Sequence, residues 1–128
     1  MADVNRGNRP LSPHLAIYRP QLGSATSIFN RITGVGMSLA AILIVWWFLA
    51  LASGAAYFDF VNGLLTSWIG ILILVGSLWA FWYHFFNGLR HLRWDMGVGL
   101  GLGEAHRTGK IAIVLSVVAT VLTVLLAI

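Results

Sequence analysis

The 128-residue sequence contains no cysteine and few charged residues. Without cysteine, the chain cannot form a disulfide, hold an iron–sulfur cluster through thiolates or attach a c-type haem covalently. Charged residues make up 9% of the sequence, whereas soluble domains carry about 25%. Hydrophobic residues, by contrast, make up 59%. This composition is typical of an integral membrane protein and excludes an ordinary soluble domain.

Long stretches of the chain lack Asp, Glu, Lys and Arg altogether. These stretches are residues 32–58, 60–89 and 111–128. Because about 20 apolar residues cross the hydrocarbon core, we expect an all-α membrane protein with three transmembrane helices in a single domain. The expected segments are a leader at 1–24, spans at about 27–52, 60–90 and 109–128, a short turn at 57–60 and a loop at 91–108.

The distribution of basic residues predicts the topology. Four of them precede or open the first span, four lie between the second and third spans, and none lies elsewhere. The positive-inside rule places the N-terminus and the loop at 91–108 in the cytoplasm and the C-terminus in the periplasm. The net charge of +4 therefore indicates orientation rather than nucleic-acid binding. The basic residues are Arg6, Arg9, Arg19, Arg31, Arg90, Arg93, Arg107 and Lys110.

The leader is polar and contains Pro10, Pro13 and Pro20, which favour extended or turn geometry. The first apolar run is too long, and begins too far from the N-terminus, to be the core of a signal peptide. We therefore expect no cleaved segment. The lack of a presequence pattern favours a bacterial inner membrane over a mitochondrial one.

His84 is the one histidine inside an apolar run, and an ionisable side chain within a span is a functional candidate. Gly88 follows one helical turn later and His91 two turns later, so the three share a helix face against which a flat macrocycle could pack. Imidazole is an axial ligand of haem iron. The alternative is a histidine that hydrogen-bonds a neighbouring helix. A haem with two histidine ligands would need its second imidazole from another subunit.

Ser27 and Arg31 lie one turn apart at the start of the first span. A hydroxyl and a guanidinium in this position could hold a quinone oxygen and stabilise negative charge during its reduction. The simpler interpretation is a capping serine and an arginine that sets orientation. Ser24, Thr26 and Ser27 are the candidates for the N-cap of this helix.

Beyond the second span, Arg90, His91, Arg93 and Asp95 are expected to continue the helix past the membrane surface. The cations could pair with haem propionates and Asp95 with an arginine, or the segment could be a solvated helix end. The Gly-rich stretch at 97–103 does not complete a dinucleotide-binding pattern and is expected to be a loop. A zinc site is also conceivable, although its spacing matches no familiar pattern. Its ligands would be His91, Asp95, Glu104 and His106.

Three stretches together resemble the cytochrome b subunits of succinate dehydrogenase: RPLSPHLAIYRP at 9–20, SIFNRITG at 27–34 and HFFNGLRHLRWD at 84–95. The last two are the most diagnostic, and the resemblance extends over essentially the whole chain. It implies that His84 is an axial ligand of haem b, shared with a second small membrane-anchor subunit. It also implies that Ser27 and Arg31 line a ubiquinone site beside the iron–sulfur subunit, with Arg31 and His91 as candidates for binding a haem propionate.

The implied function is a membrane anchor of succinate:ubiquinone oxidoreductase, an enzyme of the tricarboxylic acid cycle and of respiratory electron transfer. Electrons would pass from succinate through a flavoprotein and an iron–sulfur subunit to ubiquinone, and this chain alone would not oxidise succinate. Some family members carry histidine where this chain has Asn30, which cannot titrate. The alternatives are the anchor of a quinol:fumarate reductase, a cofactor-free scaffold or small transporter, and a stand-alone cytochrome.

Overall fold

The computed structural model describes residues 18–127, which form four helices and no strand. The helices are α1 (Leu22–Ser53), α2 (Ala55–Leu65), α3 (Trp68–Asp95) and α4 (Leu102–Ala127). Three of them, α1, α3 and α4, are long and apolar enough to cross a membrane. The predicted all-α membrane fold with three spanning helices is therefore confirmed. Most of the leader, including residues 9–17 of the first family-like stretch, lies outside the described residues.

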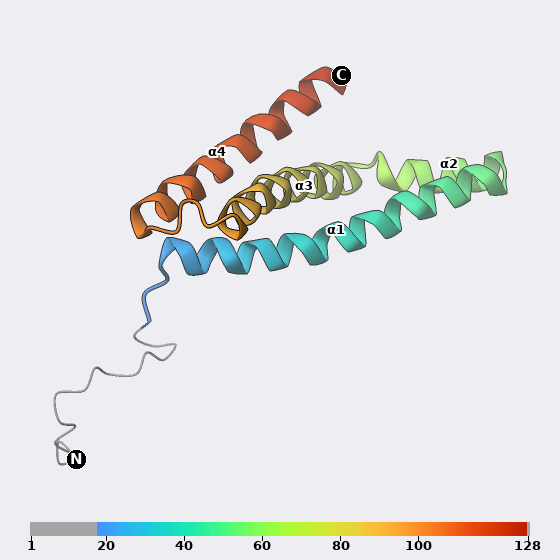
Figure 1. The fold of residues 1–128 in the computed structure, drawn as a ribbon. Helices are drawn as coiled ribbons and strands as arrows, with labels where there is room; N and C mark the ends of the chain where they lie inside the picture. The colour runs from blue at the N-terminus through green and yellow to red at the C-terminus, as the bar shows by residue number, and fades with distance from the viewer. Residues whose placement is uncertain (1–17, 128) are drawn as a thin grey trace, which may run out of the picture.

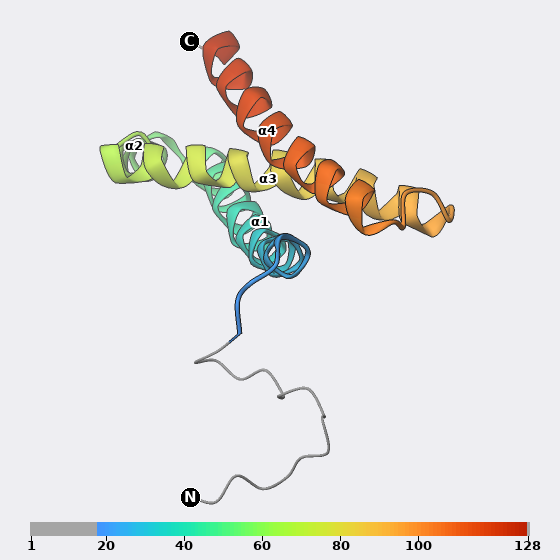
Figure 2. The same cartoon turned by 90° about the vertical axis from the view of Figure 1, so that its left-hand side faces the viewer.

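The helices pack side by side along a long bundle. α1 and α3 run antiparallel, and α2 lies beside the C-terminal end of α1 (Figure 1). α4 packs on α3 near the loop that joins them and then diverges from it towards the C-terminus, as both views show (Figures 1 and 2). The tightest meeting of α1, α3 and α4 is thus at the end of the bundle where α1 begins and α3 ends.

Small residues let α4 approach α3. Gly109, Ala112, Ser116 and Thr120 recur at helical spacing and are all buried. The hydroxyls of Ser116 and Thr120 donate to carbonyls of their own helix, so they bring no unpaired polar group into the interface. Trp82 adds a bond between helices, from Nε1 to Thr123 Oγ1 at 3.0 Å. Close approach of this kind is how helices associate in lipid, where hydrophobic burial gives little drive.

The chain reverses at Gly54 rather than at the expected turn at 57–60. Gly54 has φ of 121°, a conformation that only glycine adopts at little cost. Tyr57 and its neighbours are helical and belong to α2. The Tyr57 hydroxyl accepts a bond from Trp46 Nε1 at 2.9 Å, and Trp47 Nε1 reaches Asn62 Oδ1 at 3.2 Å. The predicted turn is wrong because α2 packs back against α1, and side chains of the two helices hydrogen-bond to each other.

The segment expected as one helix over 60–90 is divided at Thr66 and Ser67. Ser67 caps α3, with its hydroxyl oxygen accepting from the Gly70 amide at 3.2 Å. The hydroxyl also donates to the Leu64 carbonyl at 2.6 Å. Gly70 is needed here because a Cβ would collide with the carbonyl oxygens of Leu64 and Leu65.

α1 starts earlier than its candidate caps. The N-cap position is Gln21, which makes no side-chain capping bond. Ser24, Thr26 and Ser27 are inside the helix, so the predicted caps are wrong. Thr26 is buried and its hydroxyl donates to the Gly23 carbonyl at 3.0 Å.

Most large apolar side chains point outwards. The buried hydrophobic residues are few and mostly small, whereas Val35, Ile42 and Leu72 are each more than 60% exposed. Such a surface suits lipid tails and other membrane helices.

Candidate functional site

His84 lies on the face of α3 that packs against α1. Its Nδ1 is 3.1 Å from the main-chain oxygen of Asn30 and 3.4 Å from Thr33 Oγ1. A carbonyl oxygen can only accept, so Nδ1 is the protonated ring nitrogen. The Thr33 hydroxyl donates its own hydrogen to the carbonyls of Phe29 and Asn30. With Nδ1 as the donor, this bond does not use Nε2, and metal-binding histidines are held in the same way, through the ring nitrogen that does not bind the metal.

Glycines shape the space around the ring. A Cβ on Gly34 would lie 3.2 Å from His84 Cε1, so the absence of a side chain there lets the imidazole lie against α1. A Cβ on Gly88 would meet nothing within 4 Å. The helix face one turn beyond His84 is thus open, as the sequence predicted for a flat group packed beside it.

Tyr83 fixes the register of α3 beside α1. It is 2% exposed, and its hydroxyl donates to the Thr26 carbonyl at 3.0 Å. Its ring packs edge-on against Phe29, with centroids 6.4 Å apart, and lies tilted by 32° against Trp79, with centroids 5.6 Å apart. These contacts hold the neighbouring His84 at the level of Asn30.

Ser27 and Arg31 are exposed on α1, one turn apart. Neither forms a side-chain hydrogen bond or ion pair with another residue in the described part of the chain. At 100° per residue, Arg31 is about 60° around the helix axis from Gly34. The two predicted quinone residues are thus each within about one helical turn of an α1 residue that contacts His84, and their polar groups have no partner among the described residues.

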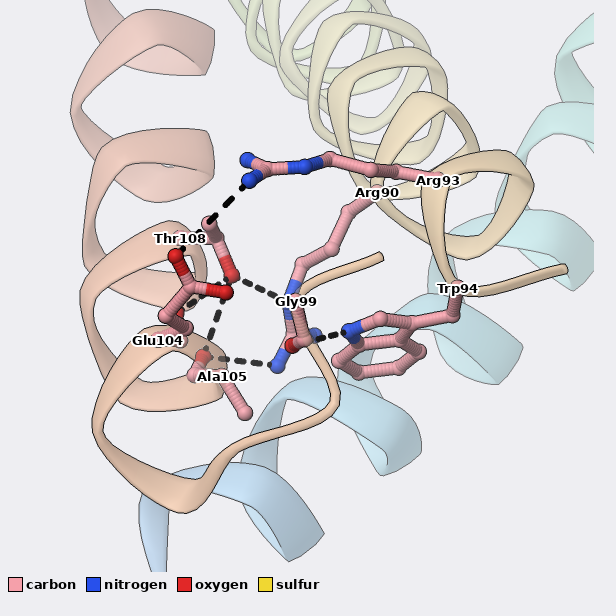
Figure 3. Close-up of polar contacts among 7 residues, drawn as sticks. All are labelled: Arg90, Arg93, Trp94, Gly99, Glu104, Ala105 and Thr108. Carbon is pink, nitrogen blue, oxygen red and sulfur yellow. Dashed lines mark hydrogen bonds and ion pairs between the residues drawn. The ribbon is translucent and has the colours of Figure 1, made fainter. Parts of the chain in front are cut away.

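Arg90 is buried, not solvated. Its side chain is 7% exposed, and it bonds through Nε to Thr108 Oγ1 at 3.1 Å and through its terminal nitrogens to Asn87 Oδ1 at 3.2 Å and the Ala105 carbonyl at 2.9 Å. The guanidinium carbon lies 4.0 Å from the ring centroid of Trp94. Figure 3 shows it lying between Trp94 and the first turns of α4. The alternative of a solvated helix end is therefore wrong for this residue, because the first turns of α4 cover it.

The other charged residues near this end also differ from expectation. Within residues 18–127, the one ion pair joins Arg93 to Glu104 at 3.9 Å, and Asp95 has no arginine partner. His91 Nδ1 bonds to the Asn87 carbonyl at 2.7 Å, beside Trp94. No group of three His, Cys, Asp or Glu side chains that could hold a metal occurs in this range, so the zinc hypothesis is wrong.

Sequence reasoning missed the residues that hold the imidazole. The partner at position 30 is a main-chain carbonyl, which no sequence pattern reports, and Thr33 looks like an ordinary residue of a span. It also missed Asn87, which is fully buried although its amide interrupts an apolar run; that interruption was a usable signal. Two buried polar atoms, Asn30 Oδ1 and Asn87 Nδ2, have no hydrogen-bond partner among the described residues.

Comparison with known proteins gives a consistent result. Residues 5–123 match the family described as "Succinate dehydrogenase/Fumarate reductase transmembrane subunit". The chain is 49% identical to the succinate dehydrogenase cytochrome b556 subunit of Paracoccus denitrificans over 98% of this chain and 96% of that protein. It is 38% identical to the cytochrome b556 subunit of Rickettsia bellii over 89% of each chain. Identity to the cytochrome b560 subunit of Marchantia polymorpha is 40%, over 81% and 80% of the two chains.

Proposed function

The chain belongs to the succinate dehydrogenase/fumarate reductase transmembrane subunit family, and we propose that it is the cytochrome b anchor subunit of a bacterial succinate:ubiquinone oxidoreductase. It is a multi-pass membrane protein whose relatives are subunits of succinate dehydrogenase. We place it in the inner membrane, with the N-terminus and the loop between α3 and α4 in the cytoplasm. A flavoprotein and an iron–sulfur subunit carry out the oxidation of succinate on that side.

His84 is one axial ligand of a haem b in this proposal. The observation that carries it is the bond from Nδ1 to the Asn30 carbonyl, because that bond leaves Nε2 free to bind iron. The open space at Gly88 supports it further. When bound, the haem supplies one-electron transfer. The other histidines, at 14, 91 and 106, lie outside the apolar runs, so the second ligand comes from a second small anchor subunit.

His91 and Arg31 are the residues assigned to the haem propionates. His91 lies two turns beyond His84 on the same face of α3, and its bond to the Asn87 carbonyl leaves the other ring nitrogen available. Arg31 is exposed and has no ion-pair partner in the described range. His91 is on the cytoplasmic side of His84, where charged carboxylates are least costly to place, and Arg31 is level with His84, between Asn30 and Gly34.

Ser27 and Arg31 form this chain's part of the ubiquinone site. The Ser27 hydroxyl donates to a quinone oxygen, and Arg31 stabilises the negative charge that develops as the quinone is reduced. Their exposure on α1 supports the assignment, because a bound quinone needs donors that are not already used within the chain. The iron–sulfur subunit covers this face and delivers the electrons.

The haem assignment is tested by a reduced-minus-oxidised absorption spectrum of the purified complex. We expect a b-type band in the wild type that is lost or shifted in His84→Leu. The matched control is His106→Leu, which changes an exposed histidine of α4 and should leave the band unaltered. An unchanged band in His84→Leu would refute axial ligation, and no band in the wild type would favour a cofactor-free scaffold or a transporter.

The quinone assignment is tested by separating two activities of the same complex. Ser27→Ala and Arg31→Gln should each lower succinate:ubiquinone activity by about tenfold or more, as removal of a donor to a developing anion does. Reduction of an artificial dye by succinate, which bypasses the anchor, should be unchanged. Arg19→Gln removes a charge from an exposed position before α1 and serves as the control. Equal losses in all three variants would argue against a direct role.

A further inference from the structure

A crevice lies between α3 and α4 at the end of the bundle where Arg90 is buried. It consists of two adjoining hollows of about 200 and 280 Å³. Both are lined by Arg93, Thr108 and Ile111. The first hollow also includes Arg90, and the second includes Arg107 and Glu104. Figure 3 shows Arg90 and Arg93 reaching from α3 towards α4.

Arg90 is a buried cation whose partners are all neutral. They are a hydroxyl, an amide and a main-chain carbonyl, together with the face of an indole ring. A guanidinium has five N–H groups, and three of them are used. A buried charge is costly unless an opposite charge compensates it. The crevice therefore favours an anion that the described chain does not supply.

The remaining charges around the crevice strengthen this preference. Arg93 and Arg107 add two cations, and Glu104 adds one anion at 3.9 Å from Arg93. With Arg90, three positive groups stand against one negative group. Asp95 and Lys110 line neither hollow. The crevice therefore keeps a net positive charge, even though Glu104 partly neutralises Arg93.

Apolar side chains continue from the cations towards the middle of the candidate spans. Leu89, Ile111 and Leu115 line the first hollow and are 48%, 46% and 42% exposed. Beyond them α4 diverges from α3 (Figure 2). The cationic end lies where two spanning helices end, the level at which lipid headgroups are found. Basic pockets between spanning helices at this level are suited to anionic headgroups.

We propose that this crevice binds an anionic phospholipid. Its phosphate lies among Arg90, Arg93 and Arg107, and an acyl chain follows Leu89 and Leu115. A free phosphate ion would satisfy the cations but would leave the apolar wall uncovered. A carboxylate from a partner subunit would leave it uncovered too. The inference goes beyond the haem and quinone roles and does not depend on either.

Native mass spectrometry of the purified complex in mild detergent tests this site. The complex is titrated with phosphatidylglycerol, phosphatidylcholine or inorganic phosphate, and bound lipid is counted. We expect retention of phosphatidylglycerol in preference to phosphatidylcholine. Arg107→Gln and Arg93→Gln should each weaken phosphatidylglycerol binding by about fivefold, the effect of one basic residue near an anionic headgroup. Both side chains are partly solvated, so neither change should unfold the chain.

Lys110→Gln is the matched control, since it removes the same charge from α4 outside the crevice. It should leave the preference for phosphatidylglycerol intact. An equal loss in Lys110→Gln would mean general surface attraction and would overturn the site. Equal binding of both lipids, or displacement of the lipid by millimolar phosphate, would also overturn the proposal. If the intact complex holds no lipid, the proposal fails in favour of a carboxylate from a partner subunit. The interpretation of these lipid-binding results does not depend on whether His84 binds haem.

Discussion

Replacing Gly34 by alanine tests whether the surface of α1 positions the imidazole of His84. The new Cβ would lie 3.2 Å from Cε1, and ordinary contact begins at 3.4 Å, so the ring must move by about 0.2 Å or more. The ring cannot move freely because Nδ1 is bonded to the Asn30 carbonyl. Overpacking of this kind costs about 1–3 kcal/mol. Alanine favours the helix over glycine by about 1 kcal/mol, which offsets part of that cost.

Gly36→Ala isolates the effect on the ring. It lies in the same helix, and its Cβ would meet nothing within 4 Å, so it gains helix propensity without a contact. The difference in stability between the two variants should therefore be about 1–3 kcal/mol. Haem binding should be weaker in Gly34→Ala by up to about 150-fold, the limit reached when the ring can relieve the contact only in the haem-free chain. Haem transfer from the complex to excess apomyoglobin, followed at the b-type band, measures this ratio.

Electron paramagnetic resonance of the oxidised complex gives a second readout, because the spectrum of a low-spin haem depends on the orientation of its axial imidazoles. Gly34→Ala should alter the spectrum and Gly36→Ala should not. Equal rates of haem transfer together with identical spectra would show that the contact with α1 does not set the ring position. The argument for His84 as a pre-oriented ligand would then fail, even if His84 is the ligand.

Two further changes probe the scaffold. Gly70→Ala should sharply reduce the yield of assembled complex, because its Cβ would collide with the Leu65 carbonyl. The control is Gly76→Ala, whose Cβ would meet nothing within 4 Å. Equal yields of the two variants by size-exclusion chromatography would contradict this prediction. Arg90→Lys should lower stability by about 2–3 kcal/mol by leaving buried acceptors unpaired, whereas Arg93→Lys should change it by less than about 1 kcal/mol. Thermal unfolding in detergent compares the two, and similar midpoints would count against the buried network.

The sequence predicted the elements that depend on composition. Spanning helices must satisfy their own backbone and present apolar side chains to lipid, so three apolar runs sufficed to find α1, α3 and α4. The division at Thr66 and Ser67 was not predictable in this way. It interrupts an apolar run without a charge or a proline, and it depends on how α2 packs back onto α1. The turn at 57–60 was predicted where Asp59 interrupts the apolar sequence, but Asp59 is a helical residue of α2.

The site was predictable where it depends on rarity and not where it depends on packing. His84 stands out because an imidazole inside a span is costly, and its place within an apolar run was enough to select it as a candidate ligand. The inward turn of Arg90 could not be foreseen, since a long flexible side chain at a helix end can equally extend into water. Only the placement of Thr108 and Ala105 on α4 decides its direction.

The bond that orients His84 ends on the main chain of residue 30, not on its side chain. Every amino acid carries that carbonyl, so exchanging Asn30 for another helix-compatible residue leaves the imidazole and its tautomer in place. The position can therefore change during evolution without cost to the ligand. The side chain at this position can therefore vary within the buried space that the Asn30 amide oxygen occupies, where that oxygen has no hydrogen-bond partner among the described residues.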